Sequence, residues 1–462
     1  MDIELEFVDS VSASATVRLD LTAPPWAVQS STEFAMPEIR RAVAATLLTD
    51  GERYPAAAYD NRVIRLVSQV QGASGDAEAA ALQALYRELD RPTNILRYRP
   101  PGASEQVYFR TFRTGPRSVV WDPHLREVSA DIPAEPFALG LRETLSPVAV
   151  SNNPATAGGC YFDVSAVRGD VETPLFLRCG PDVFGTVYDS RTIVMGVRRR
   201  GTPAQMPLVL QAEAMAAATG TTLAAANDPL MSGPGPNYMR VSPSGALMEQ
   251  RLVIPLWPAA ASEDVRGRYR VLARMRQSAI GDLWNVQLAY GASATLPIRN
   301  TSAVVNQSAT IAYYDLGTIQ LPVGGDPVTD GYSGVEAPVG GTRITVWAQR
   351  VSGTGTLDID VLLFIPADDR FSITRMWSDT GASGGIIDGL RHMVYLVDAF
   401  GAIRMPAQPE APIGGLPMVS PGVTNRVVFL PDGGSVRDFL TSTSTVTPYY
   451  WPRYLHVRPV GS

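Results

Sequence analysis

Residues Asn61–Val70 read Asn-Arg-Val-Ile-Arg-Leu-Val-Ser-Gln-Val, and residues Asp76–Leu89 read Asp-Ala-Glu-Ala-Ala-Ala-Leu-Gln-Ala-Leu-Tyr-Arg-Glu-Leu. The first stretch is rich in β-branched residues and predicts a strand. The second predicts a helix with one apolar face, formed by Leu82, Leu85, Tyr86 and Leu89. Asp76 can cap the first turn of this helix, and Pro92 prevents its continuation. A lone helix among strands must bury its apolar face against a sheet, so we expect an α+β unit here.

Short strands flank this block on both sides. The alternating patterns before it predict strands at 3–9 and 15–21 and another strand that ends at the turn Thr49–Gly51. After it, the patterns predict strands at 95–99, 107–113, 118–121 and 125–132. The chain has 462 residues with 40 Gly and 37 Pro, a composition typical of many turns between short strands. We therefore expect a mainly β protein.

Longer alternating segments begin near residue 208 and continue to about residue 366. In the segment Gly267–Arg276, apolar residues alternate with arginines, the pattern of a half-buried antiparallel strand. About eight such strands without a helix indicate a jelly roll. We expect three domains: residues 1–145 as a β-sandwich with one helix, residues 207–366 as an inserted jelly roll, and residues 146–206 with 367–462 as a discontinuous β-sandwich. The aromatic C-terminal segment from Tyr449 to Pro459 is expected to dock on folded structure.

Charge and hydropathy exclude several functions. The formal net charge is −6, which disfavours nucleic-acid binding because that needs a basic patch and a high pI. All 39 basic residues are arginine, which agrees with a GC-rich coding sequence and also with many protein–protein contacts. No apolar run is long enough for a membrane helix, and the alternating N-terminus is unlike a signal peptide. We expect a soluble protein made in the cytosol.

Catalytic motifs are absent from the sequence. The three histidines, His124, His392 and His456, are isolated from one another and lie in no known metalloprotease or hydrolase motif. The two cysteines, Cys160 and Cys179, lie on two predicted strands, where a bridge is geometrically possible but buried thiols fit a cytosolic product better. We therefore predict that the chain is not an enzyme.

Two sets of residues are candidates for ligand binding. The first consists of aromatic side chains of the predicted jelly roll that could stack on sugar rings, although aromatics on alternating strands are more often core residues: Trp257, Trp284, Tyr313 and Trp347. The second is the pair Glu213 and Asp360, which could meet at one end of the jelly roll and share a calcium ion. Solvated acids are the alternative for this pair. The triplet Arg168-Gly-Asp170 spells an integrin-type motif and carries no weight in a chain of this length.

The first third of the chain resembles the distal tail proteins of long-tailed, non-contractile bacteriophages (siphoviruses). The resemblance is carried by Asp50-Gly51, by Tyr59-Asp-Asn-Arg-Val-Ile-Arg-Leu66, by Leu85-Tyr-Arg-Glu-Leu89, by Ile95-Leu-Arg-Tyr-Arg-Pro100 and by the segment Val128–Gly140. The segment Gly414–Leu430 is similar to a strand-entry segment of phage tail proteins. These motifs belong to the fold and name no catalytic residue.

The resemblance implies a structural role. In that family the first domain forms a six-membered ring that joins the tail tube to the tip or hub complex. It therefore implies a homo-hexamer in the virion, assembled in the host cytoplasm, whose partners are the tail tube, tape measure and tip or hub proteins. The resemblance implies no cofactor, no bound nucleic acid and no membrane insertion.

The predicted insert separately resembles calcium-containing carbohydrate-binding modules. The similar segments are Gln211-Ala-Glu-Ala-Met215, Gly267-Arg-Tyr-Arg-Val271 and Leu357-Asp-Ile-Asp-Val-Leu362. Such modules often begin with Glu-Ala-Glu, whereas this chain has Gln211 in place of the first acid, and only Glu213 and Asp360 match. The resemblance implies an alternative function, a host cell-wall glycan-binding adhesin. A cell-wall hydrolase would be a third function, but the sequence offers no cluster of catalytic residues for it.

Overall fold

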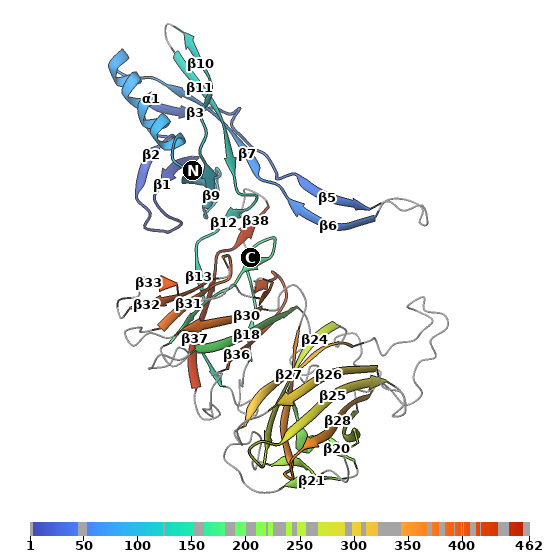
Figure 1. Ribbon diagram of the computed structural model, residues 1–462. Coiled ribbons are helices and arrows are strands. Elements are labelled where there is room, and N and C mark those ends of the chain that lie inside the picture. Colours follow the sequence, from blue (N-terminus) through green and yellow to red (C-terminus); the bar gives the residue numbers. More distant parts are fainter. Residues whose placement is uncertain are drawn as a thin grey trace. The chain divides into compact units, whose positions relative to one another are not determined.

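The computed structural model confirms a mainly β protein built from antiparallel sheets, with a single α-helix among the residues that it describes (Figure 1). It describes residues 3–44, 53–122, 125–151, 161–180, 190–199, 209–218, 220–224, 237–242, 247–255, 267–291, 298–305, 311–321, 343–366, 372–377, 384–391, 393–398, 400, 402–406, 413–415, 417–432 and 443–455. Within these ranges, no helix combines the length and the apolar character that a membrane span requires.

The chain divides into two compact units that exchange segments. Unit 1 comprises Met1–Thr144, Val167–Thr173 and Tyr450–Ser462, and unit 2 comprises Leu145–Ala166 and Pro174–Tyr449. The end of the chain therefore returns to the unit in which the chain begins. The three-domain division expected from the sequence stays a prediction.

Unit 1 is organised around an eleven-stranded sheet. Its main path runs through β2 (Val17–Asp20), β1 (Glu4–Val8), β8 (Thr93–Arg99), β9 (Val107–Phe112), β11 (Leu125–Ala134), β7 (Arg62–Val70) and β3 (Trp26–Val28). Further strands pair beside this path: β4 (Glu33–Phe34), β10 (Pro116–Asp122), β12 (Ala138–Leu139) and β38 (Arg453–Tyr454). A separate two-stranded sheet is formed by β5 (Ile39–Ala44) and β6 (Arg53–Tyr59), and β13 (Glu143–Thr144) follows β12.

The helix α1 (Gly75–Leu89) lies where its periodicity predicts it. Its N-cap is Ser74 rather than Asp76: the Ser74 hydroxyl accepts a hydrogen bond from the backbone N–H of Ala77 at 3.2 Å. Asp76 lies one residue inside the helix, where its charge still favours the positive end of the helix dipole. The sequence expectation for the cap was therefore wrong by two residues, because serine and aspartate both satisfy the chemistry of an N-cap.

One face of α1 joins the core of unit 1. Leu82, Leu85 and Leu89 are buried in it, and Tyr86 is half-buried. The same core includes residues from β1, β7, β9 and β11 and also Tyr454 from the end of the chain. Each large apolar side chain buried in this way contributes about 1.5–3 kcal/mol to folding. The helix therefore braces the sheet from which the two-stranded β5–β6 element extends (Figure 1).

Outside residues 209–366, unit 2 contains two larger sheets. One consists of β37 (Thr443–Tyr450), β17 (Phe176–Cys179), β31 (Gly384–Asp388), β32 (Met393–Val397) and β33 (Ile403–Pro406), with β14 (Val148–Ser151) beside β37. The other consists of β15 (Tyr161–Val164), β36 (Asn425–Asp432), β18 (Ser190–Arg199), β30 (Ser372–Trp377) and β34 (Ile413–Gly414). Two more short strands are β16 (Thr173–Pro174) and β35 (Met418–Val419).

The residues between 209 and 366 supply two further sheets. The six-stranded sheet contains β19 (Val209–Gln211), β21 (Thr221–Ala224), β22 (Tyr238–Val241), β29 (Leu357–Pro366), β24 (Gly267–Gln277) and β27 (Ala312–Leu321). The five-stranded sheet contains β20 (Ala216–Ala217), β23 (Glu249–Pro255), β28 (Arg343–Ser352), β25 (Leu283–Gly291) and β26 (Ile298–Val305).

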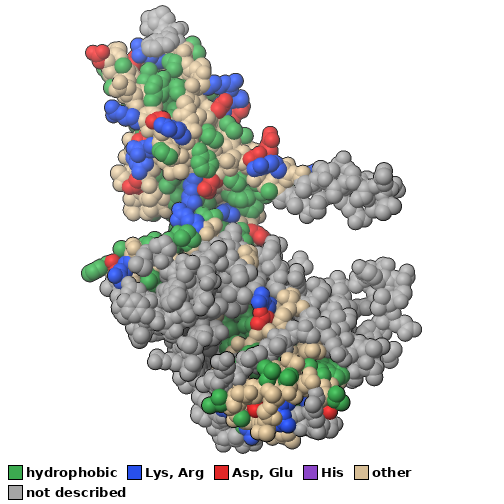
Figure 2. Space-filling model, viewed as in Figure 1, with side chains coloured by type: hydrophobic (Ala, Val, Ile, Leu, Met, Phe, Trp, Pro, Cys, Tyr) green, Lys and Arg blue, Asp and Glu red, His purple; other side chains and the backbone are tan. Residues whose placement is uncertain are grey.

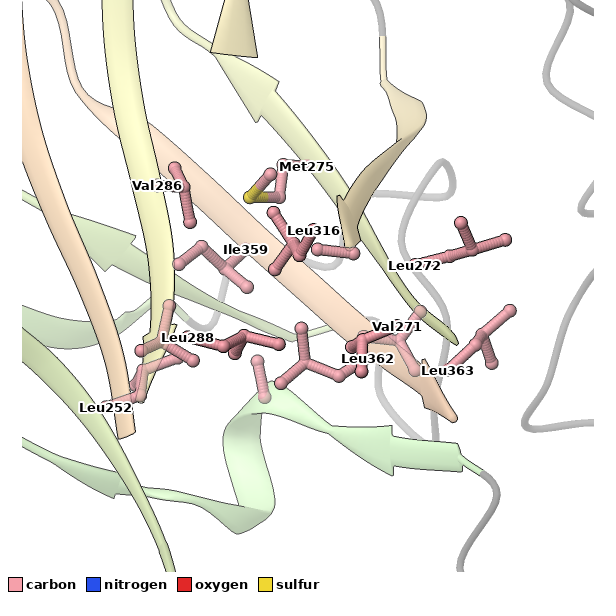
Figure 3. Close-up of a cluster of buried hydrophobic side chains, with 14 of the residues drawn as sticks. Leu252, Val271, Leu272, Met275, Val286, Leu288, Leu316, Ile359, Leu362 and Leu363 are labelled. Carbon is pink, nitrogen blue, oxygen red and sulfur yellow. The ribbon is translucent and has the colours of Figure 1, made fainter. Parts of the chain in front are cut away.

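The cluster of buried side chains in Figure 3 draws on both sheets. Val286 and Leu288 come from β25, whereas Val271 and Ile359 come from β24 and β29. The same core also takes in Val428 and Leu430 of β36. The core of the predicted insert is thus continuous with a strand that follows it in the sequence.

Candidate assembly surfaces

The β5–β6 hairpin, which we call the arm, forms a two-stranded sheet of its own beside the main sheet of unit 1. Among the described residues, β5 and β6 pair with each other and with no other strand. The four consecutive residues Glu38–Arg41 are all exposed, and Ile39 retains 48% of its accessible surface. Since successive side chains of a strand point to opposite faces, neither face of the arm is covered at this position.

The base of the arm is connected to the rest of unit 1 at two residues, Phe137 and Arg62. Tyr59, the last residue of β6, packs edge-on against Phe137 with ring centroids 5.3 Å apart. The guanidinium of Arg453 lies over the same Phe137 ring, 5.2 Å from its centroid. Phe137 therefore connects the base of the arm with β38, a strand from the end of the chain.

Arg62, the first residue of β7 and three residues after the end of the arm, makes the second connection. Its side chain is 1% exposed, and its guanidinium donates to the carbonyl oxygen of Pro136 at 2.9 and 2.6 Å and to that of Leu455 at 3.0 Å. The guanidinium also lies 5.2 Å from the centroid of the Phe109 ring. Burial lowers the pKa of Arg62 to about 10, so the group stays charged at neutral pH. Its charge is compensated by carbonyl dipoles and an aromatic face, a demanding environment for a buried cation.

Residues 450–455, which we call the C-terminal segment, lie between two other parts of unit 1. On one side Ala138 and Leu139 pair with Tyr454 and Arg453. On the other side the Arg453 carbonyl accepts a hydrogen bond from the Asp170 N–H at 2.8 Å, and the Leu455 N–H donates to the Asp170 carboxylate at 3.1 Å. Tyr454 is 4% exposed. The aromatic C-terminus thus docks, as its composition predicts.

The Arg168-Gly-Asp170 triplet is part of this arrangement. Arg168 pairs with Glu105 at 2.7 Å and with Glu143 at 2.9 Å. Gly169 has φ +119°, and a Cβ added there would lie 2.7 Å from the Arg453 carbonyl oxygen. The hydrogen bonds that Arg168 donates to Glu105 and Glu143 raise the pKa of Arg168. All three residues of the triplet therefore have structural roles within unit 1.

Charges of both signs are interspersed on unit 1. The face shown in Figure 2 carries arginines next to acidic residues, without a block of one sign. Most of the pairs are exposed, such as Arg40–Asp60 at 2.9 Å. The pair Arg97–Glu6 is the most buried of those within the described part of unit 1, with 12% and 10% of the two side chains exposed. This mixed face differs from the basic stripe of a nucleic-acid interface.

Glu213 and Asp360 do lie near each other, as the sequence suggests. Burial raises the pKa of Glu213, its own backbone N–H lowers it, and the charge of Asp360 raises it again. Apart from this local interaction with its own backbone, neither carboxylate oxygen of Glu213 has a hydrogen-bond partner among the described residues.

These two carboxylates fit a calcium ion poorly. Asp360 is wholly buried and pairs with the buried guanidinium of Arg274 at 2.5 Å, so a side chain of the protein already supplies its cation. Calcium prefers six to eight oxygen ligands. In the part of the chain that the structure describes, no three acidic, histidine or cysteine residues gather around one point. The calcium site stays a prediction, which the arginine beside Asp360 disfavours.

The four candidate aromatic residues lie in different environments. Trp284 is wholly buried in the core, so it presents no face to a sugar, and Trp257 lies outside the described residues. Tyr313 is half-buried and packs against the core. Trp347 is half-buried, and its indole N–H donates to the Thr345 hydroxyl at 2.9 Å. The structure does not bring these residues together into one site.

Trp347 has polar neighbours across its sheet. The register of β23, β28 and β25 places Gln250 and Gln287 directly opposite Trp347 on its two sides. Val346 and Ala348, on either side of Trp347 in β28, are buried in the core, so the row Gln250–Trp347–Gln287 belongs to the other face of the sheet. The side-chain oxygen of Gln287 has no hydrogen-bond partner among the described residues.

Of the histidines and cysteines, only Cys179 lies within the part of the chain that the structure describes. All three histidines and Cys160 lie outside the described residues. Cys179 is a buried free thiol, and burial raises its pKa, which makes it unreactive at neutral pH.

Sequence reasoning missed the arm contacts and the role of the C-terminal segment in unit 1. The aromatic composition of the tail indicates docking but not the docking surface. An arginine directly after a strand, such as Arg62, gives no signal that it will be buried, because its partners are backbone carbonyls far away in the sequence.

Comparison with known proteins gives structural similarities only. No family model matches the chain, and no curated protein matches it. The chain is similar to the crystal structure of the Dit (gp 19.1) protein of phage SPP1, described as a paradigm of the hub adsorption apparatus in phages that infect Gram-positive bacteria. That alignment covers 98% of this chain and 99% of the Dit chain at 9% identity, with a TM-score of 0.38.

Two further similarities involve the activated baseplate of phage P2. With calcium, the alignment covers 44% of this chain and 74% of the baseplate chain at 10% identity, with a TM-score of 0.28. With strontium, the coverage is 44% and 74% at 9% identity, with a TM-score of 0.27. At such identities and scores, we transfer neither partners nor activity from these structures to this chain.

Proposed function

We propose that this protein is a non-enzymatic structural component of a bacteriophage tail tip. In this proposal, unit 1 assembles into a homo-hexameric ring that joins the tail tube to the tip or hub complex, in the virion. The sequence resemblance of the first third supplies the family and the number six. The observation in the structure that carries the proposal is the uncovered arm.

An isolated two-stranded hairpin is marginally stable in water, and an arm that is exposed on both faces at residues 38–41 gains stability from a second surface. A second copy of the chain meets this need in a closed ring, because every copy then offers one arm and receives one. Such contacts are heterologous, and rotation by one-sixth of a turn closes them. The mixed charges around unit 1 suit a polar rim for such an interface.

Substitution of the exposed arm residue Ile39 tests this proposal in the full-length chain. We expect Ile39→Asp to lower the fraction of hexamer in native mass spectrometry about tenfold or more, because about half of this apolar side chain is exposed in one copy and is free to contact a neighbour. Phe400→Asp is the matched control, since Phe400 is a 95% exposed apolar residue of unit 2. Equal hexamer fractions for the wild type and Ile39→Asp would contradict the role of the arm.

A second candidate function, glycan binding by the residues between 209 and 366, is favoured by the row around Trp347. An indole face beside two side-chain amides combines the stacking and the hydrogen-bonding groups that a neutral sugar ring needs. Trp284 and the Glu213–Asp360 pair have no part in this candidate, because the tryptophan is buried and Asp360 is paired with Arg274.

A glycan array probed with the full-length chain tests this second function. We expect binding to neutral oligosaccharides that is lost in Trp347→Ala and kept in Tyr313→Ala, since Tyr313 lies on the other sheet. No binding to any glycan of the array, or equal binding by both variants, would contradict it. Neither result affects the proposed ring.

A further inference from the structure

The C-terminal segment is joined to the base of the arm through two side chains. Phe137 contacts both Tyr59 at the end of the arm and Arg453 of the segment. Arg62, three residues beyond Tyr59, donates to the Leu455 carbonyl at 3.0 Å. All residues of this connection, at the arm base and in the C-terminal segment, belong to unit 1.

The segment is itself fixed firmly. Thr173 donates from its hydroxyl to the Trp451 carbonyl at 2.6 Å, and the Gly140 N–H donates to the Pro452 carbonyl at 2.8 Å. The ring of Tyr450, which is 1% exposed, accepts a hydrogen bond at its hydroxyl from the Arg168 N–H at 3.1 Å. These contacts satisfy backbone groups that would otherwise be buried without partners.

The order of synthesis separates the arm from these contacts. The arm and every strand of the unit 1 sheet except β38 lie within the first 144 residues, whereas the C-terminal segment, which contains β38, follows unit 2 in the sequence. At roughly 5–20 residues per second, translation of the intervening residues takes on the order of 15–60 s. Throughout this time Arg62 and Phe137 lack their partners from residues 453–455.

We propose that the C-terminal segment positions the arm, so that unit 1 becomes competent for assembly only after residues 450–455 have been made and have docked. Chains that lack these residues then carry an unfixed arm and do not enter the ring. The segment acts as a conformational device within the fold, and the consequence for assembly rests on the proposed ring function. Positioning of the arm base is a property of one copy and does not depend on the ring.

A glycine pair in the full-length chain provides the first test. Gly169→Ala places a methyl group about where the Arg453 backbone lies, 2.7 Å from its carbonyl oxygen, and so displaces the C-terminal segment. Gly102→Ala is the matched control: Gly102 also has positive φ, at +77°, but a Cβ there has no neighbour within 4 Å. Amide hydrogen exchange at residues 53–62 reports the arm base, and exchange in β8 and β9 reports whether unit 1 is still folded.

We expect Gly169→Ala to accelerate exchange at residues 53–62 at least about tenfold, which corresponds to about 1.4 kcal/mol. Exchange in β8 and β9 should remain slow, and the hexamer fraction should fall in parallel. Gly102→Ala should change none of these. Unchanged exchange at the arm base in Gly169→Ala would overturn the proposal, whether or not the wild type forms rings. A wild type that forms no ring but shows the exchange effect would contradict the proposed function alone.

Two truncations provide a second test in case Gly169→Ala unfolds unit 1. A chain that ends at Leu455 keeps every contact of residues 450–455 described above, whereas a chain that ends at Tyr449 loses all of these contacts. We expect the longer chain to show wild-type exchange at residues 53–62 and the shorter chain to show accelerated exchange there. Equal behaviour of the two truncations would overturn the proposal.

Discussion

Replacement of Arg62 by leucine tests the connection at the base of the arm most sharply. The Arg62 guanidinium donates to the Pro136 carbonyl at 2.9 and 2.6 Å and to the Leu455 carbonyl at 3.0 Å. Leucine is apolar and about as long as the first part of the arginine side chain, so it can still contact the Phe109 ring. The substitution therefore removes the hydrogen bonds while it keeps most of the packing.

The cost follows from the two carbonyls that lose their donor. A buried acceptor without a partner costs about 1–3 kcal/mol, so two acceptors give about 2–6 kcal/mol. The relief of the buried charge and the retained packing offset part of this cost. We expect a net loss of about 2–4 kcal/mol in the local stability of the arm base.

Hydrogen exchange measured by mass spectrometry suits this two-unit protein better than a denaturation curve, because two units need not unfold in one step. In Arg62→Leu, exchange in β7 and β12 should accelerate about 30- to 700-fold, the factor that corresponds to the expected loss. Arg87→Leu is the matched control, because Arg87 is exposed on α1 and its loss should cost less than about 0.5 kcal/mol. An acceleration below about threefold in Arg62→Leu would refute the reasoning.

Three more predictions concern the cores and the buried acid. Leu85→Ala should cost about 2–5 kcal/mol in the free energy of unfolding of unit 1 and weaken ring assembly, because Leu85 is wholly buried; unchanged melting and normal rings would show that the helix does not brace the sheet. Glu213→Gln should stabilise the protein at pH 7 by about 1 kcal/mol or less and so raise its melting temperature, because the pKa of Glu213 is raised in the folded state and the wild type loses stability as the pH rises above the ordinary value of 4.5. The difference between the two proteins should vanish below that pH, and added calcium should change neither melting temperature. A calcium-dependent rise in the melting temperature of the wild type alone would restore the metal site. Tyr314→Phe should flatten the loss of stability between about pH 10 and pH 12 in alkaline titration, because burial raises the pKa of Tyr314 to about 12 and the folded state resists its ionisation; identical alkaline profiles would contradict this.

Local patterns were sufficient for much of the fold. The helix at 75–89 and the strands β1, β2 and β7 to β11 follow from periodicity and from turn residues, because these features depend on neighbours in the sequence. The N-cap was misplaced by two residues because Ser74 and Asp76 offer the same chemistry. The mainly β class followed from composition and from the scarcity of helical patterns.

The long-range contacts were beyond local patterns. Nothing in the neighbours of Arg62 indicates that its guanidinium will bind the carbonyl of Leu455, almost 400 positions later in the chain. Similarly, alternation within a strand does not reveal which of its two faces is buried. Trp284 of β25 lies in the core, whereas Trp347 of the neighbouring strand β28 lies on the other face of the same sheet. The charge of Asp360 acts on Glu213 in the structure, but the ion pair of Asp360 with Arg274 depends on the pairing of distant strands, which local patterns do not reveal.

The central claim is that unit 1 closes a six-membered ring. Electron microscopy of the purified full-length chain, with class averages along the ring axis, tests this claim most directly. The account predicts closed rings with six-fold symmetry in the wild type and their loss in Ile39→Asp. Wild-type particles that remain monomeric at every concentration, or rings with another symmetry, would contradict it.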